Sequence, residues 1–556
     1  MVLSVFRLRT GDKATVWVAA LMVGSAGVGV GCGDPEASGA TPTQEVDASD
    51  DVLTAADAGL DTQEEVQQDA REENEPDGPA DDADGGVALT WTACDTSNWA
   101  DGYPKPALGV ECTTVGVALD RAHPDAGTIA LRVARHKSKA GPTGRAVFQL
   151  AGGPGGGSVY QSGIIPWYMP ELRDEFDLIY VDQRGTGESG YLDCAEEYPE
   201  HKQQWVSCGQ QHADDALSHF GTVDAAHDLD DVRAALGYDK IHLRGGSYGT
   251  RLGLEYLRQH GDRVAAAVLD GLVPPDYPLF EEVIQDFDWG VNRLISDCKQ
   301  SASCTSLSPT LSADLTARRL ELRANPRPIK VNGSSYVEDE TLYLTILRFT
   351  IADSYWRFSV PHAVHAAASG ENSRWNALMS DVFGAVVTDT APSSVKPLRL
   401  PRPITRGASY VAPGLYAAIA CSEFLPLSGG VNALQMLAEQ QTWGNDSTDY
   451  SIIGLARACP QWNIDALDAS LLQPVSSDAK VLLLSGDIDM TTRPEWGARA
   501  LATLPNATHI VVPYATHATM VVPCVGEVIT RFLEADGEIQ QVDASCVGQL
   551  TEPPWY

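Results

Sequence analysis

The stretch that decides the fold is residues 240–256, Lys-Ile-His-Leu-Arg-Gly-Gly-Ser-Tyr-Gly-Thr-Arg-Leu-Gly-Leu-Glu-Tyr. A short apolar strand leads into the turn Gly-Gly-Ser-Tyr-Gly, and leucines at helical spacing lead away from it. In a G-x-S-x-G turn the serine occupies a strained strand-to-helix corner, so flanking glycines are needed where backbones pass closely. The helix N-terminus then points free N–H groups at the serine. We therefore predict that Ser247 is a nucleophile, against the alternative of a glycine-rich loop that happens to contain a serine.

Strand patterns on both sides of this turn predict a mostly parallel α/β sheet. Each apolar run ends in a glycine-rich or polar loop, and chemistry gathers at that edge of parallel sheets. The predicted strands are 128–133, 146–150, 176–181, 263–270, 480–485 and 509–513. Between about 275 and 475 the alternation fades and irregular helical spacing predicts an inserted, mainly helical cap. The core is then expected in two parts, 89–274 and 476–556.

Two of the late strands are followed by the residue types that a serine nucleophile needs. A serine requires a base to take its proton, and the base requires an acid to fix its tautomer. We predict that His517 is the base and Asp489 the acid. Asp487 and Asp270, which also lie at strand ends, are the alternatives for the acid.

A glycine-rich loop follows the strand at 146–150, with the sequence Ala-Gly-Gly-Pro-Gly-Gly-Gly-Ser at 151–158. Its N–H groups could cradle a phosphate or form an oxyanion hole. A phosphate loop needs a Gly-Lys-Ser/Thr ending, and no lysine is present here. We therefore predict an oxyanion hole formed by a glycine near Gly155 and by Tyr248. In the next polar loop, Asp182 and Arg184 are expected to fasten loops under the site through charge-assisted hydrogen bonds rather than take part in chemistry.

About half of the net charge of −36 lies near the N-terminus, where residues 34–86 hold 18 Asp and Glu against the single basic residue Arg71. With almost no aromatic residues, this segment cannot bury enough apolar surface to fold, so residues 33–88 are predicted to be a disordered acidic linker. Nucleic-acid binding is disfavoured because no basic footprint is present.

Residues 1–32 have the features of an export signal. Basic residues precede an apolar run from Ala14 to Val30, which ends at Gly31-Cys32. A cysteine at this point resembles the cleavage and lipidation site of bacterial lipoproteins, which predicts membrane attachment through a lipidated Cys32. Gly29 stands where those signals usually carry leucine, so ordinary signal cleavage or an uncleaved anchor are the alternatives.

Ten further cysteines follow residue 90, and an even number suits an oxidising compartment. Their spacing contains no CxxC pair or Cys/His cluster, so neither a metal nor another cofactor is predicted. Pairing of neighbours along the chain would give the disulfides Cys94–Cys112, Cys194–Cys208, Cys298–Cys304, Cys421–Cys459 and Cys524–Cys546.

Four motifs in order carry a family resemblance: Gly-Gly-Pro-Gly-Gly at 152–156, Asp-Gln-Arg-Gly-Thr-Gly-Glu-Ser at 182–189, Gly-Gly-Ser-Tyr-Gly-Thr at 245–250 and Val-Leu-Asp-Gly-Leu at 268–272. Over roughly residues 91–546 the chain resembles the secreted proline iminopeptidase and tripeptidyl aminopeptidase family of α/β-hydrolases. The resemblance implies an α/β-hydrolase fold and a serine exopeptidase that releases prolyl or tripeptidyl units from free peptide N-termini through an acyl-enzyme.

The chain departs from this family at three loops. Ala151 replaces the histidine or asparagine often found before the glycine-rich loop, and Met490-Thr491-Thr492-Arg493 replaces the usual Pro-x-Thr-Pro after the acid. Ala518 follows the histidine where glycine is usual. No triad residue is lost, but loop geometry and substrate choice are expected to differ.

An aminopeptidase must also hold an ammonium group, which calls for a carboxylate. Glu423, beside a predicted cap disulfide, is the candidate, and a structural acid is the alternative. Trp356 is expected either to line an apolar substrate pocket or to pack in the cap core.

Two other functions compete with the peptidase. A secreted esterase or other ester or amide hydrolase could use the same triad, since the fold does not fix the substrate. A surface protein that keeps the fold without turnover is the second rival, and the intact triad argues against it.

Overall fold

The computed structural model describes residues 89–96, 105–194, 201–213, 215–383, 385–389, 396–397, 411–444 and 446–556. It also describes an antiparallel strand pair near the N-terminus, β1 (Phe6–Thr10) and β2 (Ala14–Val18). The predicted acidic linker, Cys32 and most of the predicted export signal lie outside the described residues.

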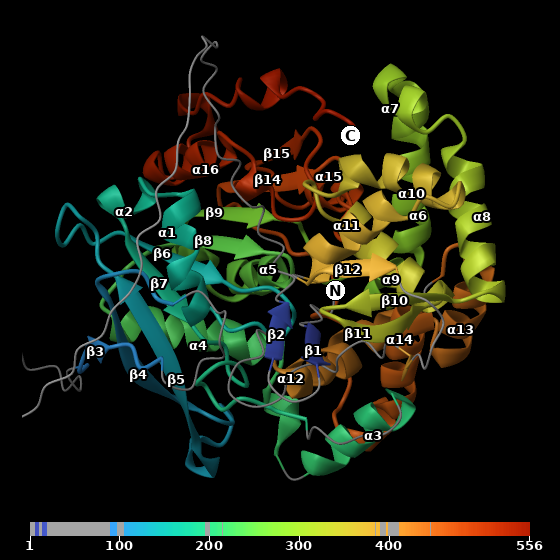
Figure 1. Ribbon diagram of the computed structural model, residues 1–556. Helices are drawn as coiled ribbons and strands as arrows, with labels where there is room; N and C mark the ends of the chain where they lie inside the picture. Colours follow the sequence, from blue (N-terminus) through green and yellow to red (C-terminus); the bar gives the residue numbers. More distant parts are fainter. Residues whose placement is uncertain are drawn as a thin grey trace, which may run out of the picture. The chain divides into compact units, whose positions relative to one another are not determined.

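Nine strands of the described residues form one sheet in the order β15-β14-β9-β8-β6-β7-β5-β4-β3 (Figure 1). The strands from β15 to β7 run parallel, and the pairs from β7 to β3 are antiparallel. The predicted mostly parallel sheet is thus confirmed. The strands are β3 (Thr92–Ala93), β4 (Val110–Ala118), β5 (Thr128–His136), β6 (Ala146–Leu150), β7 (Asp177–Val181), β8 (Ile241–Gly246), β9 (Val264–Asp270), β14 (Val481–Gly486) and β15 (Ala507–Val512).

Helices cover both faces of this sheet, which is why the central strands are buried along nearly their whole length and are mostly apolar. On one face, α4 (Thr222–Ala235) and α5 (Tyr248–His260) bury leucines against the strands. The opposite face is covered by α1 (Ile165–Tyr168), α2 (Leu172–Glu175) and α16 (Val525–Glu534). These are the two layers expected around a doubly wound sheet. The short α15 (Pro494–Ala500) lies between β14 and β15 in the chain.

The segment between about 275 and 475 is mainly helical, as predicted. Its helices are α6 (Leu279–Gln300), α7 (Ala302–Leu307), α8 (Leu311–Ala324), α9 (Glu340–Ile351), α10 (Val360–Ala368), α11 (Ser373–Phe383), α12 (Pro413–Ile419), α13 (Val431–Gln440) and α14 (Asp446–Ala458). It also contains a feature that the sequence analysis missed, a four-stranded sheet. Its strands are β10 (Arg327–Val331), β11 (Ser334–Glu338), β12 (Val387–Asp389) and β13 (Lys396–Pro397).

Two hydrophobic clusters build the cap, and each includes side chains from outside it. The first is formed by α6 and α8–α11 and also contains Ile488, Met490 and Trp555. The second is formed by α12–α14 and also contains Tyr248 and Trp205, the latter from α3 (His201–Gln211). The cap core therefore reaches both the turn of Ser247 and the loop of Asp489.

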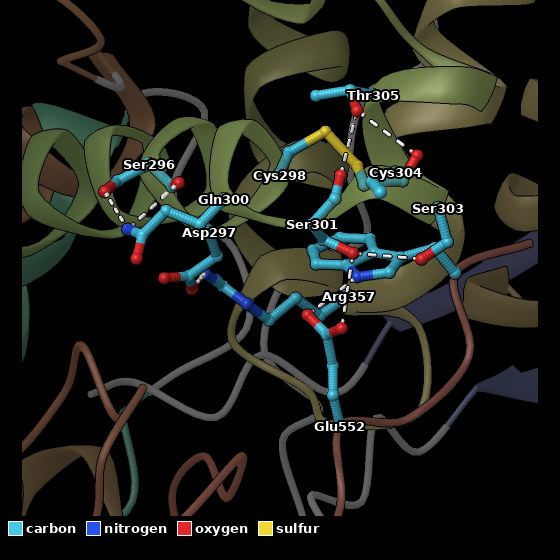
Figure 2. The surroundings of a disulfide bond; sticks show 12 residues. Ser296, Asp297, Cys298, Gln300, Ser301, Ser303, Cys304, Thr305, Arg357 and Glu552 are labelled. Carbon is cyan, nitrogen blue, oxygen red and sulfur yellow. Dashed lines mark hydrogen bonds and ion pairs between the residues drawn. A yellow bond between two sulfur atoms is a disulfide. The ribbon is translucent and has the colours of Figure 1, made fainter.

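All five disulfides connect the cysteines that the sequence analysis paired. Figure 2 shows Cys298–Cys304, which joins the end of α6 to α7. Between these cysteines Ser301 donates a hydrogen bond to Glu552 over 3.2 Å, so the C-terminal segment is attached to the cap at this point.

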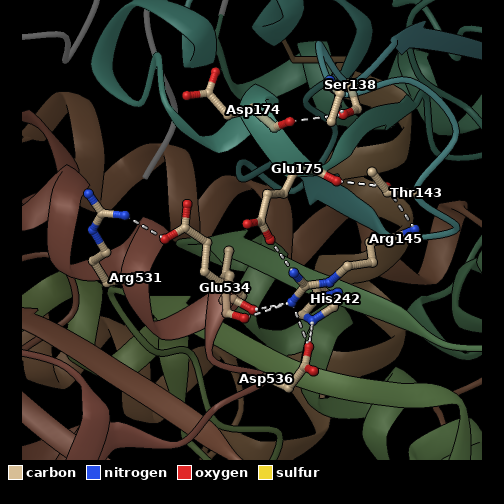
Figure 3. Close-up of polar contacts among 11 residues, drawn as sticks. Ser138, Thr143, Arg145, Asp174, Glu175, His242, Arg531, Glu534 and Asp536 are labelled. Atoms are coloured by element: carbon tan, nitrogen blue, oxygen red, sulfur yellow. Dashed lines mark hydrogen bonds and ion pairs between the residues drawn. The ribbon is translucent and has the colours of Figure 1, made fainter.

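Arg145, just before β6, connects several segments at the N-terminal ends of the parallel strands (Figure 3). Its guanidinium donates to the carbonyls of Leu533 and Glu534, at the end of α16, and forms ion pairs with Glu175 and Asp536. A cation at a helix C-terminus satisfies free carbonyls and complements the helix dipole. This structural network lies at the strand ends opposite to those that carry Ser247, Asp489 and His517.

Within the described part of the chain, no single helix has the length and apolar character needed to span a membrane. One pair, Pro413–Leu427 with Val431–Gln440, passes that test together and is bent by 82° at its break.

Candidate active site

Ser247 lies at a strained corner between β8 and α5, with φ of 55° and ψ of −129°. The neighbouring glycines are required sterically: a Cβ on Gly249 would lie 2.2 Å from the carbonyl oxygen of Leu150, and one on Gly245 would lie 2.5 Å from that of Gly249. The side chain of Ser247 makes no hydrogen bond that caps the helix. Backbone strain of this kind costs on the order of 1–3 kcal/mol and is typical of functional positions. The turn has the geometry of a nucleophile elbow.

His517 and Asp489 meet at the ends of β15 and β14. Nδ1 of His517 lies 2.9 Å from Oδ2 of Asp489. The other carboxylate oxygen accepts the N–H groups of Thr491 at 2.8 Å and Thr492 at 3.0 Å. Because a carboxylate only accepts hydrogen bonds, this contact assigns the proton to Nδ1 and leaves Nε2 free to act as a base. Asp489 is fully buried, whereas the side chain of His517 keeps 11% of its surface exposed.

The hydroxyl of Thr492 joins this pair. It donates to Oδ2 of Asp489 over 2.5 Å and lies 3.0 Å from Nδ1 of His517. The sequence analysis assigned no role to Thr492, although this residue stands at the threonine position of the family's usual Pro-x-Thr-Pro. The hydroxyl restricts both side chains to one relative orientation.

The environment of His517 favours its protonated form. Burial lowers the pKa of His517, but the charge of Asp489, the hydrogen bond to it and the charge of Asp270 together raise that pKa by more, so the net pKa lies above the ordinary value. A raised pKa makes the neutral imidazole a stronger proton acceptor.

The two alternative acids have other partners. Asp487 accepts the N–H of Tyr514 at 2.6 Å, and Asp270 accepts the N–H of Thr519 at 3.1 Å. Both carboxylates therefore fix the loop around His517 by accepting hydrogen bonds from the backbone of that loop. Of the three carboxylates considered, the described structure places Asp489 in hydrogen-bond contact with the imidazole.

Ser247 and His517 both lie close to the end of β9, and no hydrogen bond between them is present among the described residues. Both residues lie near Gly271. The N–H of Ser247 donates over 2.9 Å to the carbonyl of Asp270, the residue before Gly271. A Cβ on Gly271 would lie 3.1 Å from Cε1 of His517. On the other side, a Cβ on Gly152 would lie 3.0 Å from Cβ of Ser247. Nucleophile and base often reach hydrogen-bond geometry only once substrate is bound.

The glycine-rich loop lies beside the nucleophile and is bound to the cap. Gly156 donates to the carbonyl of Gly152 over 3.0 Å, and Ala412 donates to the carbonyl of Gly155 over 2.8 Å. A Cβ on Gly155, which has φ of +98°, would lie 2.7 Å from the carbonyl oxygen of Ala412. Among the described residues, the N–H of Gly155 has no backbone acceptor. This N–H therefore stays a candidate donor of the predicted oxyanion hole.

Tyr248 is the first residue of α5, where an N–H group has no partner within the helix. Its side chain is buried, with the phenol oxygen 2.8 Å from Oγ1 of Thr222 and 3.3 Å from Nε2 of Gln183. Burial raises the pKa of Tyr248, so the phenol stays neutral. The side chain anchors the residue, and its N–H stays the candidate for one donor of the predicted oxyanion hole.

Asp182 fastens the loops under the site, as predicted. Its carboxylate accepts N–H groups from Val159 at 2.9 Å and Glu188 at 3.1 Å, which ties two loops together. Burial raises the pKa of Asp182 to about 6. Arg184 is also fully buried and forms two hydrogen bonds with Asp228, at 2.7 and 2.6 Å. The predicted structural role of both residues is confirmed.

Glu423 does not offer the free carboxylate that was expected to receive a substrate ammonium. It is fully buried and forms an ion pair with Arg251 at 2.7 Å, while its other oxygen accepts the N–H of Thr222 at 2.8 Å. Thr222 begins α4, so Glu423 caps that helix from a distant segment. The structural alternative therefore describes Glu423. Trp356 packs against the first cap cluster, which agrees with the core alternative.

In the part of the chain that the structure describes, no group of three or more His, Cys, Asp or Glu side chains could hold a metal ion.

Comparisons with known proteins agree with this geometry. The sequence profile of the family described as alpha/beta hydrolase fold matches residues 146–522. Serine protease Hip1 of Mycobacterium tuberculosis is 31% identical over 246 residues, which cover 39% of this chain and 46% of the relative. Tripeptidyl aminopeptidase of Streptomyces coelicolor is 28% identical over 217 residues, 34% of this chain and 39% of the relative. Proline iminopeptidase of Neisseria gonorrhoeae is 32% identical over 136 residues, 24% of this chain and 34% of the relative.

The chain thus matches half or less of the length of these three curated relatives. The family profile, in contrast, covers more than half of the chain, from the strand before the glycine-rich loop to the residues just after His517. The chain belongs to the alpha/beta-hydrolase fold family, and named peptidases are among its relatives.

Proposed function

We propose that the chain is a serine hydrolase that releases prolyl or tripeptidyl units from free peptide N-termini through an acyl-enzyme. The observation that carries the hydrolase part is the Asp489–His517 hydrogen bond beside the strained Ser247. The peptidase part is supported by the names of the relatives and by the ordered motifs of the family that the chain resembles.

In this proposal Oγ of Ser247 attacks the scissile carbonyl while Nε2 of His517 takes the hydroxyl proton. Asp489 stabilises the imidazolium through Nδ1. The N–H groups of Tyr248 and Gly155 receive the oxyanion, which collapses as His517 gives its proton to the leaving amine. A water molecule then attacks the acyl-enzyme by the same route, with His517 again as base, and releases the acid product.

The free-amine requirement separates the exopeptidase from an esterase or endopeptidase. Because Glu423 is already paired with Arg251, the substrate ammonium must be met by another acceptor in the site. The test compares a tripeptide p-nitroanilide and a prolyl p-nitroanilide with their N-acetylated forms, and uses Ser247→Ala as the blank. Faster turnover of the free-amine forms is expected. Equal or faster turnover of the acetylated forms would contradict the exopeptidase, and turnover of p-nitrophenyl esters alone would favour the esterase.

We further propose that the protein is exported, either secreted or attached to the cell envelope through a lipidated Cys32. Five disulfides in the described chain support an oxidising compartment. Thiol labelling of the denatured, unreduced protein from its native host is expected to find the ten later cysteines blocked. Mass spectrometry of the mature N-terminus would distinguish a lipidated Cys32 from ordinary cleavage.

A further inference from the structure

The end of β9 occupies a central position in the site. In the sheet, Asp270 is paired with Gly246 of β8, just before the nucleophile, and with Leu484 of β14, the strand that leads to Asp489. The strand thus runs between the nucleophile and the acid. The proposed mechanism gives Asp270 no role, although its side chain is 98% buried within this site.

The backbone at this strand end bonds to the turn of Ser247 and to β14, and it lies close to the Asp489–His517 pair. The carbonyl of Asp270 accepts the N–H of Ser247 at 2.9 Å, and the N–H of Gly271 donates to Leu484 over 2.9 Å. Gly271 has φ of +72°, and a Cβ there would lie 2.7 Å from Oγ1 of Thr492. Only glycine allows this approach of the strand to the Asp–His pair.

The side chain of Asp270 holds the residues that follow the base. Its Oδ1 accepts the N–H of Thr519 at 3.1 Å and the hydroxyl of Thr519 at 3.0 Å, and its Oδ2 accepts the N–H of Met520 at 3.3 Å. On the other side, the buried guanidinium of Arg244 lies 3.8 Å from Oδ2. The carboxylate thus fixes a short loop that begins at His517.

We propose that Asp270 is a positioning residue that sets the separation between nucleophile and base, with its carbonyl fixing the Ser247 backbone and its carboxylate fixing the loop after His517. The proposal rests on the triad of the proposed function. It explains how one residue can fix the relative positions of the Ser247 turn and the His517 loop, which lie far apart in the chain. The negative charge of Asp270 also contributes to the raised pKa of His517, after the larger effects of burial and of Asp489.

The test is Asp270→Asn, measured on p-nitrophenyl acetate so that the result does not depend on peptide specificity. The amide can accept the hydrogen bonds of Thr519, but its NH2 group would face the N–H of Met520. We expect kcat to fall by about 10- to 100-fold with KM changed less than about twofold, because the base is misplaced rather than substrate binding lost. The acid limb of kcat/KM should move to lower pH, since one negative charge near His517 is removed.

Asp487→Asn is the matched control, since Asp487 holds the same loop from its other end through Tyr514. It should leave the acid limb in place. An Asp270→Asn protein with wild-type melting temperature and unchanged kcat would overturn the proposal, and so would a lower kcat without a shifted limb, which indicates a merely structural role.

If Asp270→Asn does not fold, Thr519→Val replaces it, because it removes only the hydroxyl bond. A loss in kcat of about fivefold at constant KM is expected, and an unchanged kcat overturns the proposal. Ser247→Ala separates this failure from that of the proposed function: a Ser247→Ala protein that keeps its activity refutes the triad itself.

Discussion

Two buried carboxylates, one in the loop after β14 and one in the cap, have partners of different chemistry. Asp489 and Glu423 are both shielded from solvent, and each accepts a backbone N–H and a charged or chargeable side chain. Asp489 faces a histidine that can gain or lose a proton, whereas Glu423 faces an arginine that keeps its charge. We therefore expect Asp489, whose partner titrates, to assist proton transfer, and Glu423, whose partner does not, to be structural. Burial and residue type alone do not distinguish the two.

The largest effect on activity is expected when the proposed nucleophile, Ser247, is removed. Ser247→Ala should lower kcat by roughly 10⁶-fold, because the acyl-enzyme cannot form, while the protein stays folded. Burst and steady-state release of p-nitrophenol from an ester measure this loss. Wild-type turnover of the purified variant would show that the elbow is not catalytic.

Asp489→Asn should lower kcat by about 10⁴-fold, since an amide that donates to Nδ1 would favour the wrong tautomer of His517. The same change at the other carboxylate, Glu423→Gln, should leave kcat within about tenfold, because Arg251 does not exchange protons in the cycle. Steady-state kinetics of both variants on one ester check the contrast. Comparable losses in kcat would erase the distinction between the two acids.

The pH profile tests the titrating partner. Only neutral His517 can accept the serine proton, so kcat/KM should fall about tenfold per pH unit below the pKa of His517. Since that pKa is raised, the midpoint of the limb should lie above 6.5, the ordinary value for histidine. A pH series of kcat/KM in buffers of constant ionic strength locates the midpoint. A limb at or below the ordinary value would argue that Asp489 does not stabilise the imidazolium.

The smallest expected effect on activity accompanies a measurable loss of stability. Glu423→Gln leaves the buried Arg251 without its counter-charge and weakens the cap of α4, so the free energy of unfolding should fall by about 1–3 kcal/mol. Denaturant unfolding measures this change. The free-amine and N-acetylated peptides should lose activity equally, and a loss confined to free-amine peptides would restore Glu423 as the ammonium site.

Local sequence pattern was sufficient where the structure is decided locally. The Gly-x-Ser-x-Gly pattern predicted the elbow because its glycines are required by close backbone contacts around one strand-turn-helix unit. The disulfides joined neighbouring cysteines, with sequence separations between 6 and 38 residues. The polar residues after β14 and β15 predicted the Asp489–His517 pair, because parallel strands deliver their C-terminal ends to one edge.

Partners chosen across the chain could not be predicted. Glu423 pairs with Arg251 at a separation of 172 residues, and nothing local to either residue signals that contact. The cap sheet was missed for a different reason. Its hairpin turns at Asn332-Gly333, where both φ angles are positive, a strong hairpin signal that helical spacing on either side concealed.

The attachment of the C-terminal segment to the cap has a consequence for folding kinetics. The Ser301–Glu552 hydrogen bond spans 251 residues, and Trp555 is buried in the same cluster as Phe287 of α6. Contacts between residues so far apart in the sequence require the loss of much chain entropy before they form, so they form slowly. We therefore expect the first cap cluster to complete its packing late in folding, after the residues that follow His517 have taken their places. An isolated 275–475 fragment would lack Ile488, Met490 and Trp555 and would collapse without reaching this packing.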